Sequence, residues 1–210
     1  MKLNPNKTAL LVIDMQGGFL HPESPTCIPS AMETVPRCVF VQEKARELGI
    51  PVIFVIRKYA PDGTDVEFTR YEAWKQGGKP CSGPEGNISW EMPKEFQVLP
   101  GDRVLYKPRY SAFFQTNLDG LLRRMGLDTV LITGTTTPNC IRATVFDAIS
   151  LDYNTVLIED CCSSVTEEIQ RVNMQGMAAI GAVVTDTETF LEEQVDLPVT
   201  IEAVRQAIKG

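Results

Sequence analysis

The sequence alternates short apolar runs with longer segments of helical periodicity. Six apolar runs have the composition of buried parallel strands, and they cover residues 8–13, 51–56, 103–106, 129–133, 155–158 and 182–184. Six segments with apolar residues on one helical face separate or follow them, at residues 31–48, 116–124, 139–150, 165–180, 187–193 and 200–209. This alternation predicts a single α/β domain over residues 1–210, with a parallel sheet covered by helices on both faces.

One long irregular stretch interrupts the alternation. Residues 58–100 contain both tryptophans and many of the glycines and prolines. A loop of this length inside a compact domain usually has a function. We expect a lid or an oligomer contact there, with a short helix at residues 65–75.

Composition excludes several classes of protein. The net charge is −7 and there is no long run of Lys or Arg, so we expect no nucleic-acid partner. No segment approaches the roughly 18 apolar residues of a membrane span, and residues 1–7 lack the apolar core of a signal peptide. We therefore expect a cytoplasmic protein with no membrane partner, whose six irregularly spaced cysteines are free thiols.

Three reactive side chains follow three different predicted strands. Asp14 follows the first strand, Lys107 ends the third, and Cys140 follows the fourth, at the start of a helix. Because the carboxyl ends of parallel strands meet at one edge of the sheet, we expect these side chains to lie close together.

The position of Cys140 predicts an activated thiol. Free N–H groups and the helix dipole favour a thiolate in the first turn of a helix, and a nearby Lys107 ammonium would lower the thiol pKa further. Asp14 can accept the thiol proton, and the N–H groups can hold an oxyanion. Taken singly, Asp14 could be a cap, Lys107 an exposed cation and Cys140 an inert thiol. Their combination favours catalysis.

Three segments resemble the isochorismatase-like cysteine hydrolases, a family that includes nicotinamidase, N-carbamoylsarcosine amidase, ureidoacrylate amidohydrolase and biuret hydrolase. They are LLVIDMQGGF at 10–19, YKPRYSAF at 106–113 and TGTTTPNCIRATVFDA at 133–148, and DGTDVEF at 62–68 resembles the carbamoyl-hydrolysing branch. The resemblance implies a three-layer α/β/α sandwich on a six-stranded parallel sheet and a homo-oligomer, either a dimer or a tetramer. It also implies a catalytic triad of Asp14, Lys107 and Cys140. A cis peptide bond between Thr135 and Thr136 and an oxyanion hole formed by the backbone N–H groups of Thr136 and Cys140 are implied as well.

The sequence departs from the nicotinamidases of this family at their metal site. Those proteins carry an Asp and several His residues after the second strand, whereas residues 57–62 read RKYAPD and His21 is the only histidine. Asp residues alone would bind zinc-like ions poorly. We therefore predict no metal and no cofactor, which argues against a nicotinamidase. The presence of Cys140 argues against an isochorismatase, since several isochorismatases lack the cysteine.

The expected activity is metal-independent hydrolysis of a C–N bond in a small linear amide, ureido or N-carbamoyl compound. Candidates for substrate contact are Phe19, Trp90, Tyr110, Phe113, Thr137 and Arg142. Arg142 could bind a substrate carboxylate. However, the second helical position after Cys140 points about 200° away, so an ion pair of Arg142 with Asp147 or Glu159 is an equal alternative.

Three alternatives stay open. The substrate could be a ureido or biuret-like compound, or a carboxylated amide. The chain could be a catalytically silent binding or subunit protein, although the retained Asp14, Lys107 and Cys140 argue against this. A thiol redox sensor is the third alternative, but neither Cys161 nor Cys162 is an obvious resolving partner.

Overall fold

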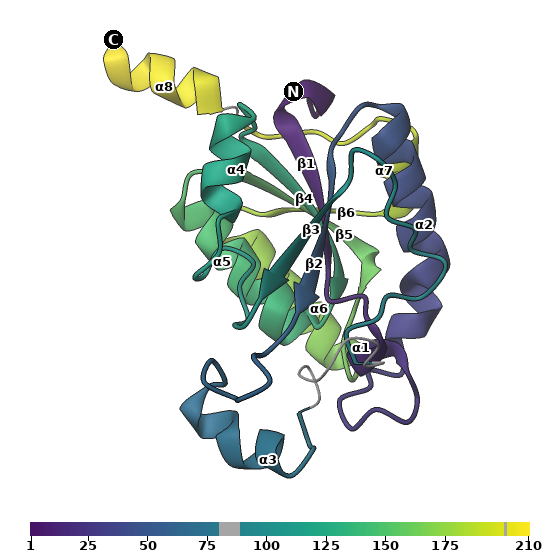
Figure 1. Cartoon of the computed structure of the whole chain (residues 1–210). Coiled ribbons are helices and arrows are strands. Elements are labelled where there is room, and N and C mark those ends of the chain that lie inside the picture. The colour runs from purple at the N-terminus through teal and green to yellow at the C-terminus, as the bar shows by residue number, and fades with distance from the viewer. Residues whose placement is uncertain (80–88, 200) are drawn as a thin grey trace.

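A six-stranded, all-parallel sheet forms the centre of the molecule. The computed structural model describes residues 1–79, 89–199 and 201–210, and its strand order is β3-β2-β1-β4-β5-β6 (Figure 1). The strands are β1 (Thr8–Ile13), β2 (Val52–Arg57), β3 (Arg103–Lys107), β4 (Thr129–Thr135), β5 (Asn154–Ser163) and β6 (Val183–Thr185). Each pair of neighbours is parallel, so all carboxyl ends lie at one edge.

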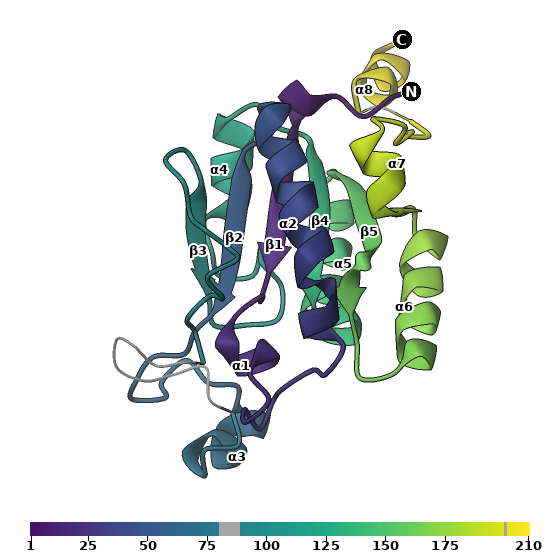
Figure 2. The ribbon, with the colours of Figure 1, turned by 90° about the vertical axis from the view of Figure 1, so that its right-hand side faces the viewer.

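Helices cover both faces of the sheet, which confirms the predicted three-layer sandwich (Figures 1 and 2). The helices α2 (Ala31–Glu47) and α7 (Thr187–Leu191) cover one face, and α4 (Leu118–Arg124), α5 (Arg142–Ser150) and α6 (Glu167–Ala179) cover the other. Successive side chains of β1 point to opposite faces of the sheet, so this strand contributes to the core on each face. Leu10 and Val12 pack into the core under α2, whereas Leu11 and Ile13 pack into the core under α4 and α5.

Shorter elements lie at the two ends of the sheet. They are η1 (Pro5–Lys7), α1 (Gly17–Leu20), η2 (Phe68–Arg70), α3 (Tyr71–Lys75), the π-helical turn η3 (Thr137–Ile141) and α8 (Ile201–Lys209). The α1 and α3 helices lie beyond the carboxyl ends of the strands, and α8 lies at the opposite end (Figure 1). Within the described ranges, no helix has the length and apolar character needed to cross a bilayer.

The sheet contains all six predicted strands, but some boundaries differ. β5 continues to Ser163 instead of ending at residue 158, because Gly134 and Thr135 of β4 still pair with Cys162 and Ser163 after an irregularity in the ladder. The sequence did not predict this extension, because the polar pair Glu159–Asp160 interrupts the apolar run. The helix predicted at residues 139–150 begins with the π turn η3, and the helix predicted at residues 65–75 is divided into η2 and α3.

Gly134 allows β4 to run directly against β1 at the edge that carries Asp14. Its φ is 118°, and a Cβ atom there would overlap the carbonyl oxygen of Ile13. Any side chain would therefore push the two strands apart, in addition to the strain of the positive φ.

We expect Gly134→Ala to destabilise the protein more than Gly181→Ala. Gly181 has a similar φ of 107°, but a Cβ atom there would have no neighbour within 4 Å. The control should therefore cost about 1–2 kcal/mol from backbone strain alone, and Gly134→Ala should cost at least about 2 kcal/mol more because strands β1 and β4 must separate. Urea unfolding of both variants measures the difference, and equal losses would contradict the close approach at Gly134.

Candidate active site

A fully buried ion pair lies at the carboxyl edge of the sheet. Lys107 ends β3 and Asp14 follows β1, and both side chains are completely buried. Lys107 Nζ donates to Asp14 Oδ2 at 2.9 Å and to the carbonyl oxygen of Arg109 at 3.1 Å. Asp14 has a φ of 55°, and its other carboxylate oxygen, Oδ1, is buried with no hydrogen-bond partner in the described part of the chain. One carboxylate oxygen is therefore available to take a proton.

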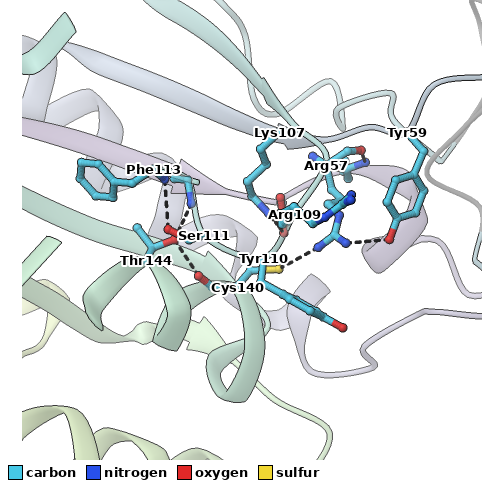
Figure 3. A network of polar contacts seen from close by, with 12 residues as sticks. Arg57, Tyr59, Lys107, Arg109, Tyr110, Ser111, Phe113, Cys140 and Thr144 are labelled. Atoms are coloured by element: carbon cyan, nitrogen blue, oxygen red, sulfur yellow. Dashed lines mark hydrogen bonds and ion pairs between the residues drawn. The ribbon is translucent and has the colours of Figure 1, made fainter. Parts of the chain in front are cut away.

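Cys140 lies in the π turn η3 that joins β4 to α5, and only 3% of its surface is exposed. The peptide bond between Thr135 and Thr136, just before this turn, is cis, at the position that the resemblance implies. Thr144 anchors the turn from inside α5. Its hydroxyl donates to the carbonyl oxygen of Cys140 at 2.7 Å and accepts the N–H of Ala112 at 3.0 Å, which ties the cysteine to the segment after β3 (Figure 3).

A buried arginine that the sequence analysis did not single out contacts the thiol. Arg57 ends β2, and its Nη1 lies 3.9 Å from Cys140 Sγ. Its Nη2 donates to the hydroxyl of Tyr59 at 2.6 Å and to Glu67 Oε1, and the Tyr59 hydroxyl donates to Glu67 Oε2 at 2.6 Å. Figure 3 shows the guanidinium between Cys140 and Tyr59. The contacts with Tyr59 and Glu67 fix a positive charge beside the nucleophile candidate.

The pKa of Cys140 is raised, which corrects the expectation of a lowered one. Burial disfavours the thiolate most strongly, and the Asp14 carboxylate raises the pKa further. The Lys107 and Arg57 cations act in the opposite direction, as expected, but do not overcome burial. Burial of the sulfur therefore favours the protonated thiol.

A cavity of about 460 Å³ opens beside Cys140, a size that suits a small molecule. Its wall includes Phe19, Arg57, Tyr59, Arg70, Tyr110, Thr136, Asn139 and Cys140. A larger cavity of about 690 Å³, lined mainly by the end of β5, the segment after it and α6, contains neither Cys140 nor Arg57 in its wall. The smaller cavity is therefore the candidate active site.

Phe19 and Tyr110 are the two predicted substrate contacts that line this cavity. Phe113 instead packs in the core, with its ring centroid 5.5 Å from that of Tyr153. The buried hydroxyl of Thr137 donates to the carbonyl oxygen of Ser163 at 3.0 Å. The expectation of substrate contact is thus corrected for Phe113 and Thr137, whose side chains serve packing and the join between η3 and β5.

Trp90 and Arg142 also lie outside the cavity wall. Lys58 Nζ is 3.4 Å from the centre of the Trp90 ring, which packs edge-on against Tyr106. The Arg142 guanidinium lies over the ring of Phe146 and donates to Asn173 Oδ1 at 3.5 Å, so it neither lines the cavity nor forms the alternative ion pair with Asp147 or Glu159. Helix geometry explains why Arg142 does not line the cavity, because its position in α5 turns its side chain away from Cys140.

The residues after β2 do not fit the metal ion that nicotinamidases of the resembled family hold there. Arg57 has only hydrogen-bond donors and a permanent positive charge, so it cannot ligate a cation. Glu67, the nearby carboxylate, is already bound by Arg57 and Tyr59. Within residues 1–79, 89–199 and 201–210, no group of three or more His, Cys, Asp or Glu side chains could hold a metal ion.

Comparison with known proteins gives the family. Residues 8–189 match the isochorismatase domain. A "probable inactive nicotinamidase" of Arabidopsis thaliana is 39% identical over 191 residues, covering 89% of this chain and 95% of the relative. The ureidoacrylate amidohydrolase RutB of Pantoea ananatis is 33% identical over 175 residues, covering 74% and 69%. The crystal structure of an isochorismatase family protein from Desulfovibrio vulgaris superposes with a TM-score of 0.83 at 39% identity, covering 89% and 97%. The chain belongs to the isochorismatase family of hydrolases, which confirms the resemblance found in the sequence.

We expect alkylation of Cys140 by iodoacetamide to accelerate with pH, with a midpoint above that of an ordinary thiol. Arg57→Gln removes a cation that lowers the thiol pKa, so the midpoint should move higher and the rate at about pH 8 should fall at least threefold. Peptide mass spectrometry measures modification of Cys140 separately from the other cysteines.

Two variants control this experiment. Lys58→Gln removes the neighbouring positive charge, which lies over Trp90 and not beside the thiol, and should leave the midpoint in place. The double variant Arg57→Gln with Glu67→Gln avoids leaving an unpaired carboxylate. An equal midpoint in the Arg57 and Lys58 variants would contradict the role given to Arg57.

Proposed function

We propose that this chain is a metal-independent cysteine amidohydrolase that cleaves a C–N bond of a small linear amide, ureido or N-carbamoyl compound. The observation that carries the proposal is the juxtaposition of a buried Lys107–Asp14 pair with a thiol in a cavity wall. Asp14 acts on the Cys140 thiol through its negative charge and through a side-chain hydrogen bond. The same carboxylate can therefore take the thiol proton when the sulfur attacks a substrate.

The reaction begins with proton transfer. Because burial favours the protonated form of the Cys140 thiol, Asp14 removes its proton as the sulfur attacks the substrate carbonyl carbon. The negative charge on the carbonyl oxygen forms against the backbone N–H groups of Thr136 and Cys140, both in the cavity wall. Lys107 and Arg57 stabilise the developing negative charge around the sulfur.

Collapse of this intermediate releases the amine. Asp14, now protonated, gives its proton to the leaving nitrogen, the C–N bond breaks, and an acyl or carbamoyl thioester remains on Cys140. Asp14 then removes a proton from water, whose oxygen attacks the thioester carbonyl. The C–S bond breaks, the acid product leaves, and the sulfur regains the proton from Asp14.

The relatives support hydrolysis and also define the second candidate. One relative is named an amidohydrolase, whereas the Arabidopsis relative is named a probable inactive nicotinamidase. A catalytically silent binding protein would need a cavity but would not need Asp14, Lys107 and Cys140 together. Their retention around a cavity of substrate size favours hydrolysis. A cytoplasmic location and a dimeric or tetrameric state stay predictions.

We expect Cys140→Ala to lose at least about 10³-fold in kcat/KM, because no other group can form the thioester. An ammonia-release screen over ureido, biuret-like and carboxylated amides first identifies a substrate, and the variant is then compared with the native chain. Cys27→Ala is the matched control. Cys27 lies in the same cavity wall, but its thiol contacts the carbonyl oxygen of Leu20 and not the ion pair.

Two outcomes would overturn the proposal. Amide hydrolysis that survives in Cys140→Ala would exclude the thioester mechanism. A folded native chain that releases no ammonia from any compound of the screen would favour the silent binding protein.

A further inference from the structure

The cavity of about 690 Å³ meets the candidate active site at Val165, the one residue that the described walls of both cavities share. It forms where β6 ends. β6 pairs with β5 only as far as Ile158, so residues 159–163 of β5 have no strand of the described chain on that side. Helix α6 lies beside this free edge (Figure 2) and supplies much of the wall, so we call this space the α6 cavity. Its volume is typical of a site for a small molecule.

Two polar atoms in the wall of the α6 cavity have no hydrogen-bond partner among residues 1–79, 89–199 and 201–210. They are the hydroxyl oxygen of Ser164, a residue that is 5% exposed, and Oε1 of Gln170. The orientation of the Gln170 amide is fixed, because its Nε2 donates to the carbonyl oxygens of Glu159 at 3.3 Å and Cys162 at 3.2 Å. Both unpartnered oxygens can accept a hydrogen bond, so the wall favours a ligand that donates.

The charges of the wall favour a cation. Three exposed carboxylates line the α6 cavity, those of Glu33, Glu159 and Glu167, and none of them forms an ion pair in the described chain. Arg171 is the one cation of the described wall, and it donates to Gln175 Oε1 at 3.2 Å. By contrast, the charged side chains in the described wall of the candidate active site are all positive. The two adjoining cavities therefore prefer ligands of opposite charge.

We propose that the α6 cavity binds a linear alkyl diamine or polyamine, with one ammonium at Ser164 and Gln170 and another at the carboxylates. This inference does not depend on amide hydrolysis and goes beyond the proposed function. An ammonium has three donors and no acceptor, which matches the two unpartnered oxygens. A serine hydroxyl rotates among three staggered positions, so Ser164 can direct its oxygen toward the ligand. The methylene chain would pack on Met174 and Val184, which also line the cavity.

The test compares cadaverine, a five-carbon diamine, with pentanediol, the neutral diol that has the same carbon chain. Calorimetry at low ionic strength should show that the native chain binds cadaverine at least about tenfold more tightly. Ser164→Ala should weaken cadaverine binding at least about fivefold, because the ammonium loses a charged hydrogen bond. The same variant should be as resistant to urea as the native chain, since the native hydroxyl has no partner to lose. A merely structural role would give the reverse, a loss of stability with unchanged binding.

Glu167 and Glu168 provide a matched pair of variants. Both are exposed in the first turn of α6, but only Glu167 lines the cavity. Glu167→Gln should weaken cadaverine binding about threefold, whereas Glu168→Gln should leave it unchanged. Equal losses in the two variants would mean that the diamine is attracted by the acidic chain as a whole, and would overturn the inference.

Arg57→Gln identifies which cavity holds the diamine. Loss of this cation would make the candidate active site more favourable for a diamine, so the affinity should rise if cadaverine bound beside Cys140. We expect no change, and a rise would overturn the inference. Equal binding of cadaverine and pentanediol, no binding of cadaverine, or native affinity in Ser164→Ala would also overturn it. If Ser164→Ala fails to fold, the comparison of Glu167→Gln with Glu168→Gln decides.

Discussion

The candidate active site depends on an ion pair that water cannot reach. Asp14 and Lys107 are both completely buried, and they come from strands that are separated by β2 in the sheet. Removing two charges from water costs several kcal/mol per ion, and their attraction offsets this only when the geometry is fixed. The sheet fixes the geometry of the ion pair. Ile13 pairs with Val55 and Arg57 pairs with Lys107, so the strand register sets the positions of Asp14 and Lys107 relative to each other. A buried ion pair is weak evidence for stability, so its presence beside the Cys140 thiol is better explained by the proposed chemistry.

The same burial determines how the thiol can act. Two cations lie near Cys140, and yet its pKa is raised, so loss of hydration outweighs their attraction for the thiolate. Burial therefore favours a protonated sulfur before the substrate binds. In the proposed mechanism, proton transfer to Asp14 accompanies the attack of the sulfur on the substrate. This gives Asp14 a role that no arrangement of cations alone could replace.

Periodicity and parallel topology were sufficient to predict the six strands and the meeting of Asp14, Lys107 and Cys140. These features follow from local composition and from the shared direction of the strands. The role of Arg57 could not be predicted in the same way, because it depends on the chain folding back to bring Glu67 beside it. Phe113 was placed wrongly because an aromatic residue near a motif can face the core as readily as the cavity.

Arg57 also changes what the position after β2 can contribute to catalysis. A metal ion there would accept electron pairs from substrate or water, whereas a guanidinium only donates hydrogen bonds and supplies a fixed charge. Because Glu67 and Tyr59 occupy one side of that guanidinium, its remaining effect is directed toward Cys140.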